Sequence, residues 1–245
     1  MRSVTPFGPE RHVGYAILMG VRLTKMGHSC VRLEDHSFTI VIDPGVLTEP
    51  EAVQGADALF ITHEHFDHLS EERIARAARA KPGLPVWTCA AVAAKLDGLP
   101  LRVHTVGHGD AFAVGGMSVQ VHGEHHAVTH PDRPPVANVG FLVNDAVFHP
   151  GDAFTLPETA VATLLLPASA PWLKVTEMID YVRAVRPDRA YSIHEGLLNE
   201  HGLNLVDSVL ADLAAAPEGP PTSPSAAGWQ PADIRRLTPG QFVDL

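Results

Sequence analysis

The sequence predicts an α/β (α+β) fold, a four-layer αββα sandwich in which two mixed sheets pack face to face and helices cover their outer sides. The chain divides into two halves that are each rich in strand patterns and each finished with helical patterns. Its 245 residues, 45% of them hydrophobic, can bury one large core, so we expect a single domain over residues 19–245. We expect an irregular N-terminal extension over residues 1–18, and a surface loop rich in Pro, Ser and Gly over residues 216–228.

The first half opens with a hairpin pattern. Residues 21–33 and 37–42 alternate in hydrophobicity and are rich in β-branched side chains, with a polar turn between them. Residues 58–61 are a short apolar run that predicts a buried strand. Ser70 predicts the N-cap of a helix over residues 70–80, because two glutamates follow it where the helix dipole favours acidic side chains.

Alternation of strands and helices follows. Residues 85–88 predict a strand, and Thr88 predicts the N-cap of a helix of Ala, Val and Leu that ends near Gly98. Together with the strand at residues 58–61 and the helix after it, this order is the βαβ alternation of a parallel sheet. Period-two patterning then returns over residues 101–121 and predicts further strands.

The second half repeats this plan. Residues 139–143 and 146–148 flank Asn144-Asp145, a pair typical of a tight hairpin turn. The later patterns predict a buried strand at residues 161–166, a helix over 175–182, a strand at 189–193, a helix over 205–213 and a final strand over 234–245.

A dense group of polar side chains directly follows the apolar run at residues 58–61. The string Thr-His-Glu-His-Phe-Asp-His over residues 62–68 holds three imidazoles and two carboxylates. Imidazole nitrogen and carboxylate oxygen suit zinc and related divalent metals. Two pairs of potential ligands at such close spacing can serve two neighbouring ions. An isolated histidine means little in a chain with 15 of them, so the ordered string carries the prediction.

Charge and composition exclude several classes of partner. The formal net charge is −10 and no cluster of Lys and Arg occurs, so the basic footprint of a nucleic-acid-binding protein is missing and a small molecule is the expected substrate. No apolar run reaches the roughly eighteen residues of a membrane span. Residues 13–21 have the length of a signal-peptide core but no small-residue cleavage site follows, and Cys30 and Cys89 form no CxxC pair. A cytoplasmic location is the default expectation, and no feature of the sequence predicts an oligomeric state.

The order of these motifs along the chain resembles that of the metallo-β-lactamase-fold hydrolases, in particular the branch with L-ascorbate-6-phosphate lactonases and uncharacterised metal-dependent hydrolases. The resemblance covers about residues 21–215, and it implies the metallo-β-lactamase form of the αββα sandwich. The segments that carry it are Gly27-His28-Ser29-Cys30, Ile42-Asp43-Pro44-Gly45, the Thr-His-x-His-x-Asp-His string, His125-His126, Gly151-Asp152 and His194 after Tyr191-Ser192-Ile193.

The resemblance also implies a two-metal site. The water shared by the two ions would lose a proton near neutral pH and act as the nucleophile. The ions are expected to be Zn²⁺, with Mn²⁺ or Fe²⁺ as alternatives that the same ligands accept. The implied ligands are His63, His65 and His126 for the first ion, Asp67, His68 and His194 for the second, and Asp152 as the bridge between them.

Four further expectations concern the surroundings of this site. Strand alternation does not decide between His125 and His126 as the third ligand, and only the resemblance favours His126. Asp67 is also expected to orient the nucleophile. His28 is a candidate for a proton-transfer or supporting role near the metals, with a purely structural hydrogen bond as the alternative. Residues 130–135 look like a loop on the substrate side, although Pro-rich loops are more often only connections.

The function predicted from these observations is hydrolysis of a small ester, lactone, amide or phosphodiester. The aspartate at position 152 and the absence of any cysteine after Cys89 disfavour a true β-lactamase. One alternative is an iron-dependent oxidative enzyme of the same fold with a single metal, similar to persulfide dioxygenases. The other is a member that binds a ligand without turnover. No loop around the predicted metal site identifies the substrate.

Overall fold

The computed structural model describes residues 20–36, 38–215 and 232–245 and contains two seven-stranded sheets. The predicted extension over residues 1–18 and the predicted loop over residues 216–228 lie outside the described residues. In spatial order, sheet 1 is β14 (Phe242–Asp244), β1 (Val21–Lys25), β2 (Val31–Asp35), β3 (Phe38–Ile42), β4 (Ala58–Ile61), β5 (Leu84–Thr88) and β6 (Leu101–Thr105). Sheet 2 is β13 (Asp233–Arg235), β12 (Arg189–Ile193), β11 (Thr163–Pro167), β10 (Val147–His149), β9 (Gly140–Val143), β8 (Met117–His122) and β7 (Ala111–Val114).

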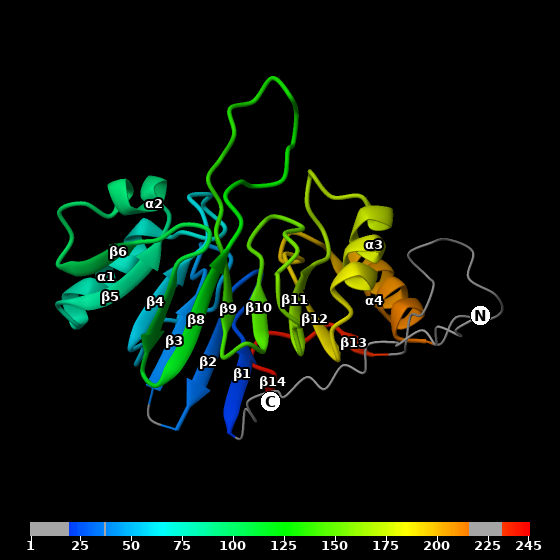
Figure 1. Ribbon diagram of the computed structural model, residues 1–245, viewed down its shortest axis with the longest axis horizontal. Coiled ribbons are helices and arrows are strands. Elements are labelled where there is room, and N and C mark those ends of the chain that lie inside the picture. Colours follow the sequence, from blue (N-terminus) through cyan, green and yellow to red (C-terminus); the bar gives the residue numbers. More distant parts are fainter. Residues whose placement is uncertain (1–19, 37, 216–231) are drawn as a thin grey trace, which may run out of the picture.

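Helices lie on the outer sides of the two sheets (Figure 1). The helices α1 (Glu71–Ala80) and α2 (Ala90–Lys95) accompany sheet 1, and α3 (Val175–Val185) and α4 (Glu200–Ala214) accompany sheet 2. The predicted four-layer αββα sandwich is therefore confirmed. Among the described residues, no helix combines the length and apolar character needed to cross a bilayer.

Both sheets are mixed, and their strand directions decide where a site can form. In sheet 1, β3, β4, β5 and β6 pair in parallel, and in sheet 2, β10 to β13 do the same. Because β9 is antiparallel to both β8 and β10, β8 also runs in the direction of β10 and β12. The carboxyl ends of β8, β10 and β12 therefore meet at one edge, which is where open α/β sheets bind ligands.

The main core fills the space between the two sheets. Phe60 on β4 is fully buried, and its ring centroid lies 4.8 Å from that of Phe141 on β9 of the opposite sheet. Trp87 lies 5.6 Å from Phe60 and stacks on Phe112 at 5.0 Å. Such aromatic contacts across the interface hold the two sheets in one position relative to each other.

Two local predictions are confirmed by the backbone. Ser70 caps α1, with its side-chain oxygen accepting a hydrogen bond from the N–H of Arg73 at 3.4 Å. Asn144 and Asp145 join β9 to β10 with φ of 52° at both positions, as a tight hairpin turn requires.

Residues 21–33 form two strands, so the prediction of one continuous strand is wrong. The chain leaves β1 and reverses through Gly27 and His28, whose φ angles are +97° and +43°. The N–H of Cys30 donates to the carbonyl of Gly27 at 2.8 Å and closes this turn. The hydrophobic alternation continues across the turn because β1 and β2 pair antiparallel and share the same buried face.

Two further expectations are corrected. Thr88 does not cap α2: it ends β5, where its hydroxyl donates to the carbonyl of Ile61 at 2.8 Å, and Cys89 takes the N-cap position. Residues 234–245 do not form one strand, because β13 belongs to sheet 2 and β14 to sheet 1. Between them the chain turns at Gly240, whose φ is +85° and whose N–H donates to the carbonyl of Lys25.

Candidate metal centre

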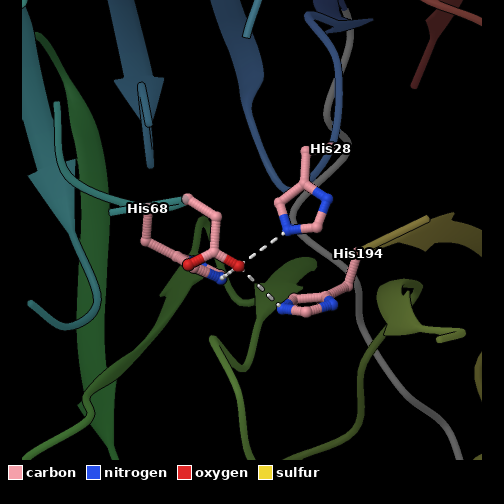
Figure 2. Close-up of side chains that lie close together, drawn as sticks. His28, His68 and His194 are labelled. Carbon is pink, nitrogen blue, oxygen red and sulfur yellow. Dashed lines mark hydrogen bonds and ion pairs between the residues drawn. The ribbon is translucent and has the colours of Figure 1, made fainter. Parts of the chain in front are cut away.

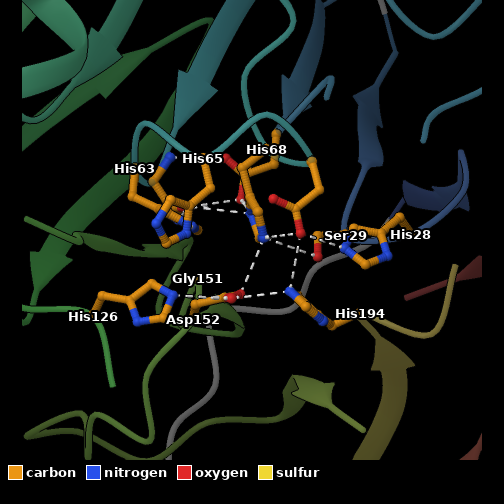
Figure 3. Close-up of polar contacts among 12 residues, drawn as sticks. His28, Ser29, His63, His65, His68, His126, Gly151, Asp152 and His194 are labelled. Carbon is orange, nitrogen blue, oxygen red and sulfur yellow. Dashed lines mark hydrogen bonds and ion pairs between the residues drawn. The ribbon is translucent and has the colours of Figure 1, made fainter. Parts of the chain in front are cut away.

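The candidate ligands converge from five segments at the ends of strands in both sheets (Figure 3). The loop after β4 supplies the residues of the Thr-His-x-His-x-Asp-His string, and the turn between β1 and β2 supplies His28. The segments after β8, β10 and β12 supply His126, Asp152 and His194. The ligand atoms of these residues fall into two groups, within each of which they lie no more than 4.8 Å apart.

The first group contains His63, His65, His126 and Asp152. Nε2 of His63 lies 3.1 Å from Nδ1 of His65, and Nε2 of His126 lies 3.2 Å from Oδ2 of Asp152. All but the half-buried His65 are buried. The structure thus brings together the three histidines that the resemblance implies for the first ion.

The second group contains His28, Asp67, His68 and His194 (Figure 2). Oδ2 of Asp67 lies 3.3 Å from Nε2 of His194 and 3.9 Å from Nε2 of His68. All four residues are buried. Three of them are the residues expected to hold the second ion, and His28 is the additional member.

Asp152 lies between the two groups. Its Oδ1 is 3.1 Å from Nε2 of His68, and its Oδ2 is 2.9 Å from Nε2 of His194 and 3.2 Å from Nε2 of His126. Oδ1 of Asp152 and Nε2 of His194 are buried, yet neither makes a hydrogen bond in the described part of the chain. Buried polar atoms that face one another without hydrogen-bond geometry fit ligands directed at a shared cation.

Each of three histidines has its outer ring nitrogen fixed by a hydrogen bond. Nδ1–H of His126 donates to the carbonyl of Ala127 at 2.6 Å, and Nδ1–H of His194 donates to the carbonyl of Ser169 at 2.6 Å. Nδ1–H of His68 donates to the carboxylate of Asp43 at 2.7 Å. These bonds place the proton on Nδ1 and leave the lone pair of Nε2 directed inward, as in metal-ligating histidines.

Asp43 supports the candidate ligand His68. From the sequence, Asp43 was identified only as part of an Asp-Pro turn, and this role was not predicted. Its carboxylate also accepts hydrogen bonds from the backbone N–H and the hydroxyl of Thr62, each at 2.7 Å. Asp43 is fully buried and has a φ of +51°, a strained conformation for a residue with a side chain. A nearby glycine, Gly45, allows the loop to close, because a Cβ there would lie 1.9 Å from the carbonyl oxygen of Asp67.

Asp152 is held by two residues from other segments. Its backbone N–H donates to Oδ1 of Asn138 at 3.0 Å, and the indole N–H of Trp172 donates to its Oδ2 at 3.0 Å. Neither of these two contacts was predicted from the sequence. Both contacts join residues far apart in the chain, so no local pattern predicts them.

Burial and charge act against each other in this site. Burial alone would lower the pKa of His68, but the carboxylates of Asp152 and Asp43 raise that pKa well above its ordinary value. The pKa of His194 is likewise raised to about 9, because the carboxylates of Asp152 and Asp67 beside its Nε2 outweigh burial. The pKa of Asp152 is held well below its usual range despite burial, chiefly by the neighbouring His68. The site therefore favours bound positive charge.

His28 supports Asp67 through a defined tautomer. Its Nδ1 accepts a hydrogen bond from the N–H of Gly196 at 3.0 Å, so the ring proton lies on Nε2 and is donated to Oδ2 of Asp67 at 3.0 Å. Burial lowers the pKa of His28 to about 4, so the ring is neutral at pH 7. Because Nε2 carries the proton, it offers no lone pair to a metal ion. His28 therefore orients Asp67 through a hydrogen bond, whereas the other two histidines of the group direct a free Nε2 inward.

We therefore expect His28→Ala to weaken the binding of Zn²⁺ about 10- to 100-fold, which is typical when the partner of a ligand is lost. His28→Gln can present an amide N–H to Asp67 and is expected to recover part of this loss. Competition with a fluorescent zinc chelator measures both. Equal affinity in His28→Ala and the unmodified chain would show that the hydrogen bond has no such role.

A buried ion pair lies behind the second group and was not predicted. Nζ of Lys25 lies 2.8 Å from Oε1 of Glu195, and it donates hydrogen bonds to the carbonyls of Ser192 and His28. Lys25 is only 2% exposed. Because these contacts join the β1–β2 turn to the end of β12, Lys25 fixes the positions of His28 and His194 relative to each other.

The adjacent histidines at positions 125 and 126 occupy different environments. His126 is buried in the first group, whereas His125 is exposed and its backbone forms an isolated bridge with Ala137. The structure thus places His126, the residue favoured by the resemblance, among the candidate ligands.

Comparisons with known proteins agree with this geometry. A family model described as the beta-lactamase superfamily domain matches residues 22–194. Protein Rv0786c of Mycobacterium tuberculosis is 36% identical over 184 residues, which cover 73% of this chain and 85% of that protein. A UPF0173 metal-dependent hydrolase of Desulforamulus reducens is 25% identical over 195 residues, covering 71% of this chain and 84% of that protein.

A solved structure also shares the fold. The metallo-beta-lactamase fold protein YhfI from Bacillus subtilis superposes with a TM-score of 0.64 at 11% identity, covering 91% of this chain and 98% of that chain. At this identity the likeness concerns the fold alone. The relatives described above indicate the wider superfamily and its UPF0173 group, and they give no specific support to the lactonase branch.

Proposed function

The chain belongs to the metallo-β-lactamase superfamily, and from this membership and its two groups of ligands we propose that it is a metal-dependent hydrolase of a small ester, lactone, amide or phosphodiester. The relative from Desulforamulus reducens that carries the name metal-dependent hydrolase supports this proposal. The observation that carries it is the position of Asp152, whose two oxygens face histidines of both groups.

Two divalent ions fit the donor set, and we propose Zn²⁺ for both. His63, His65 and His126 would hold the first ion and Asp67, His68 and His194 the second, with Asp152 shared. When bound, the ions supply a water of lowered pKa and polarise the oxygen of the scissile group. The same nitrogen and oxygen atoms also accept Mn²⁺ or Fe²⁺, so the ion that is bound depends on which metal is supplied.

The residues of the chain would offset the charge of the ions and hold the ligands in position. Asp67 and Asp152 offset part of the positive charge of two cations. The N–H groups of His28 and Trp172 fix one oxygen of each carboxylate. Asp43 holds His68 in place. Because these supporting groups are buried and hydrogen-bonded, the ligands need little rearrangement when a substrate binds.

The proposal is tested by turnover of zinc-loaded protein on a panel of esters, lactones, amides and phosphodiesters. We expect hydrolysis of at least one class and its loss in His65→Ala. The control is His201→Ala, which changes an exposed histidine of α4 and should leave the rate unchanged. No turnover across the panel, together with identical behaviour of His65→Ala, would contradict the proposal and favour a ligand-binding role without catalysis.

We also propose a small-molecule substrate and no nucleic-acid partner. The net charge of −10 and the absence of a basic cluster support this view. An electrophoretic mobility shift with labelled RNA and DNA at low salt should therefore show no complex.

A further inference from the structure

A cavity of about 560 Å³ opens beside the first group of ligands. His65 and His126 belong to its lining, and the rest of the lining comes from residues 125–136 of the segment between β8 and β9. This segment projects as a long loop from the end of the sandwich (Figure 1). The volume lies within the range of roughly 300 to 1,000 Å³ that small-molecule sites occupy.

The lining carries positive charge, although the chain as a whole is acidic. The chain carries 28 acidic and 18 basic residues, yet no Asp or Glu lines the cavity, while Arg133 does. Within the described residues, no carboxylate makes an ion pair with the guanidinium of Arg133. Asp132 is the neighbouring acid in this loop, but its Oδ2 lies 3.5 Å from Nδ1 of His130. The guanidinium is therefore free to pair with an anion that enters the cavity.

The remaining wall is largely apolar. Val128 is 73% exposed, and Pro131 and Pro134 also belong to the lining. An exposed apolar surface of this kind, next to a catalytic centre and broken by one cation, is typical of a site that binds a molecule with both an apolar body and an anionic end.

We propose that this cavity binds the substrate through a carboxylate that pairs with Arg133, while the apolar body of the substrate lies against Val128 and the prolines. The inference rests on the proposed hydrolase function and specifies its substrate class as carboxylate-bearing small esters or lactones. In the reaction, water adds across the acyl carbon–oxygen bond and yields an acid and an alcohol. The guanidinium fork makes two parallel hydrogen bonds to a carboxylate, which a neutral ester cannot accept in the same way.

Two esters that differ only by a terminal carboxylate on the acyl chain test this. Mono-4-nitrophenyl glutarate carries a free carboxylate, and 4-nitrophenyl butyrate does not. For zinc-loaded protein we expect a higher kcat/KM on the glutarate ester, a loss of about tenfold or more for that ester in Arg133→Gln, and a change of less than about twofold for the butyrate. Arg133→Lys should recover part of the loss. The control Arg79→Gln, at an exposed position on α1, should change neither rate.

A binding measurement separates this inference from the proposed function. Calorimetric titration with the amide analogue N-(4-nitrophenyl)glutaramic acid should give at least tenfold weaker affinity for Arg133→Gln than for the unmodified chain. If the amide binds through Arg133 but no ester, lactone, amide or phosphodiester of the panel is turned over, the hydrolase proposal fails and the carboxylate site stands. If esters are hydrolysed but Arg133→Gln affects both esters equally and leaves the affinity for the amide unchanged, the carboxylate site is wrong.

Discussion

Asp152→Asn is expected to lower kcat/KM of the zinc-loaded protein by about 10³-fold or more. The change keeps the shape of the side chain but removes its charge and one oxygen, so a single residue can no longer serve both groups. A rate loss of this size corresponds to several kcal/mol of lost transition-state stabilisation by the metal site. Steady-state kinetics on the best substrate of the panel, with metal content measured on the same sample, check the prediction.

Asp212→Asn provides a matched control for this variant. Asp212 is an exposed acid on α4, far from the candidate ligands in sequence, and its replacement should leave the rate and the metal content unchanged. If Asp152→Asn kept the full rate and the full metal content, the account of Asp152 as the shared ligand would be wrong.

Lys25→Met is expected to reduce the free energy of unfolding by about 3–5 kcal/mol, because it leaves the buried carboxylate of Glu195 without its cation. Oε2 of Glu195 already lacks a hydrogen-bond partner among the described residues, so no hydrogen bond to that oxygen makes up for the lost ion pair. Urea unfolding of the metal-free chain measures the effect independently of any activity. The double variant Lys25→Met with Glu195→Gln should lose less, since no unpaired charge then stays buried.

Lys174→Met serves as the control for Lys25. Lys174 pairs with Glu177 at 3.1 Å, but the side chain of Lys174 is 76% exposed, and exposed pairs contribute little. A loss in Lys25→Met no greater than that in Lys174→Met would mean that the buried pair does not hold the two strand ends together.

The fold and the candidate ligands between residues 62 and 68 could be predicted because their signals lie close together in the chain. The string over residues 62–68 combines ligand types directly after an apolar strand, and the paired strand patterns on either side define the two sheets. His126, Asp152 and His194 were identified only through a resemblance, since each of them alone is an ordinary residue at a strand end.

The supporting contacts could not be predicted, because they join positions that no local pattern connects. Asp43 reaches His68 across 25 residues, Lys25 reaches the carbonyl of Ser192 across 167, and the indole of Trp172 reaches Asp152 across 20. Local rules also failed where tertiary pairing decided the outcome, as for Thr88, whose hydroxyl bonds to the neighbouring strand, and for residues 234–245, which the two sheets share.

We propose above that this chain holds two divalent ions on one shared carboxylate and uses them for hydrolysis. Elemental analysis of the purified protein, made alongside an oxygen-electrode measurement during turnover, is the decisive experiment. We expect two zinc or manganese ions per chain, hydrolysis of a panel substrate and no oxygen uptake. About one iron per chain together with oxygen consumption would contradict it and identify an oxidative enzyme of the same fold.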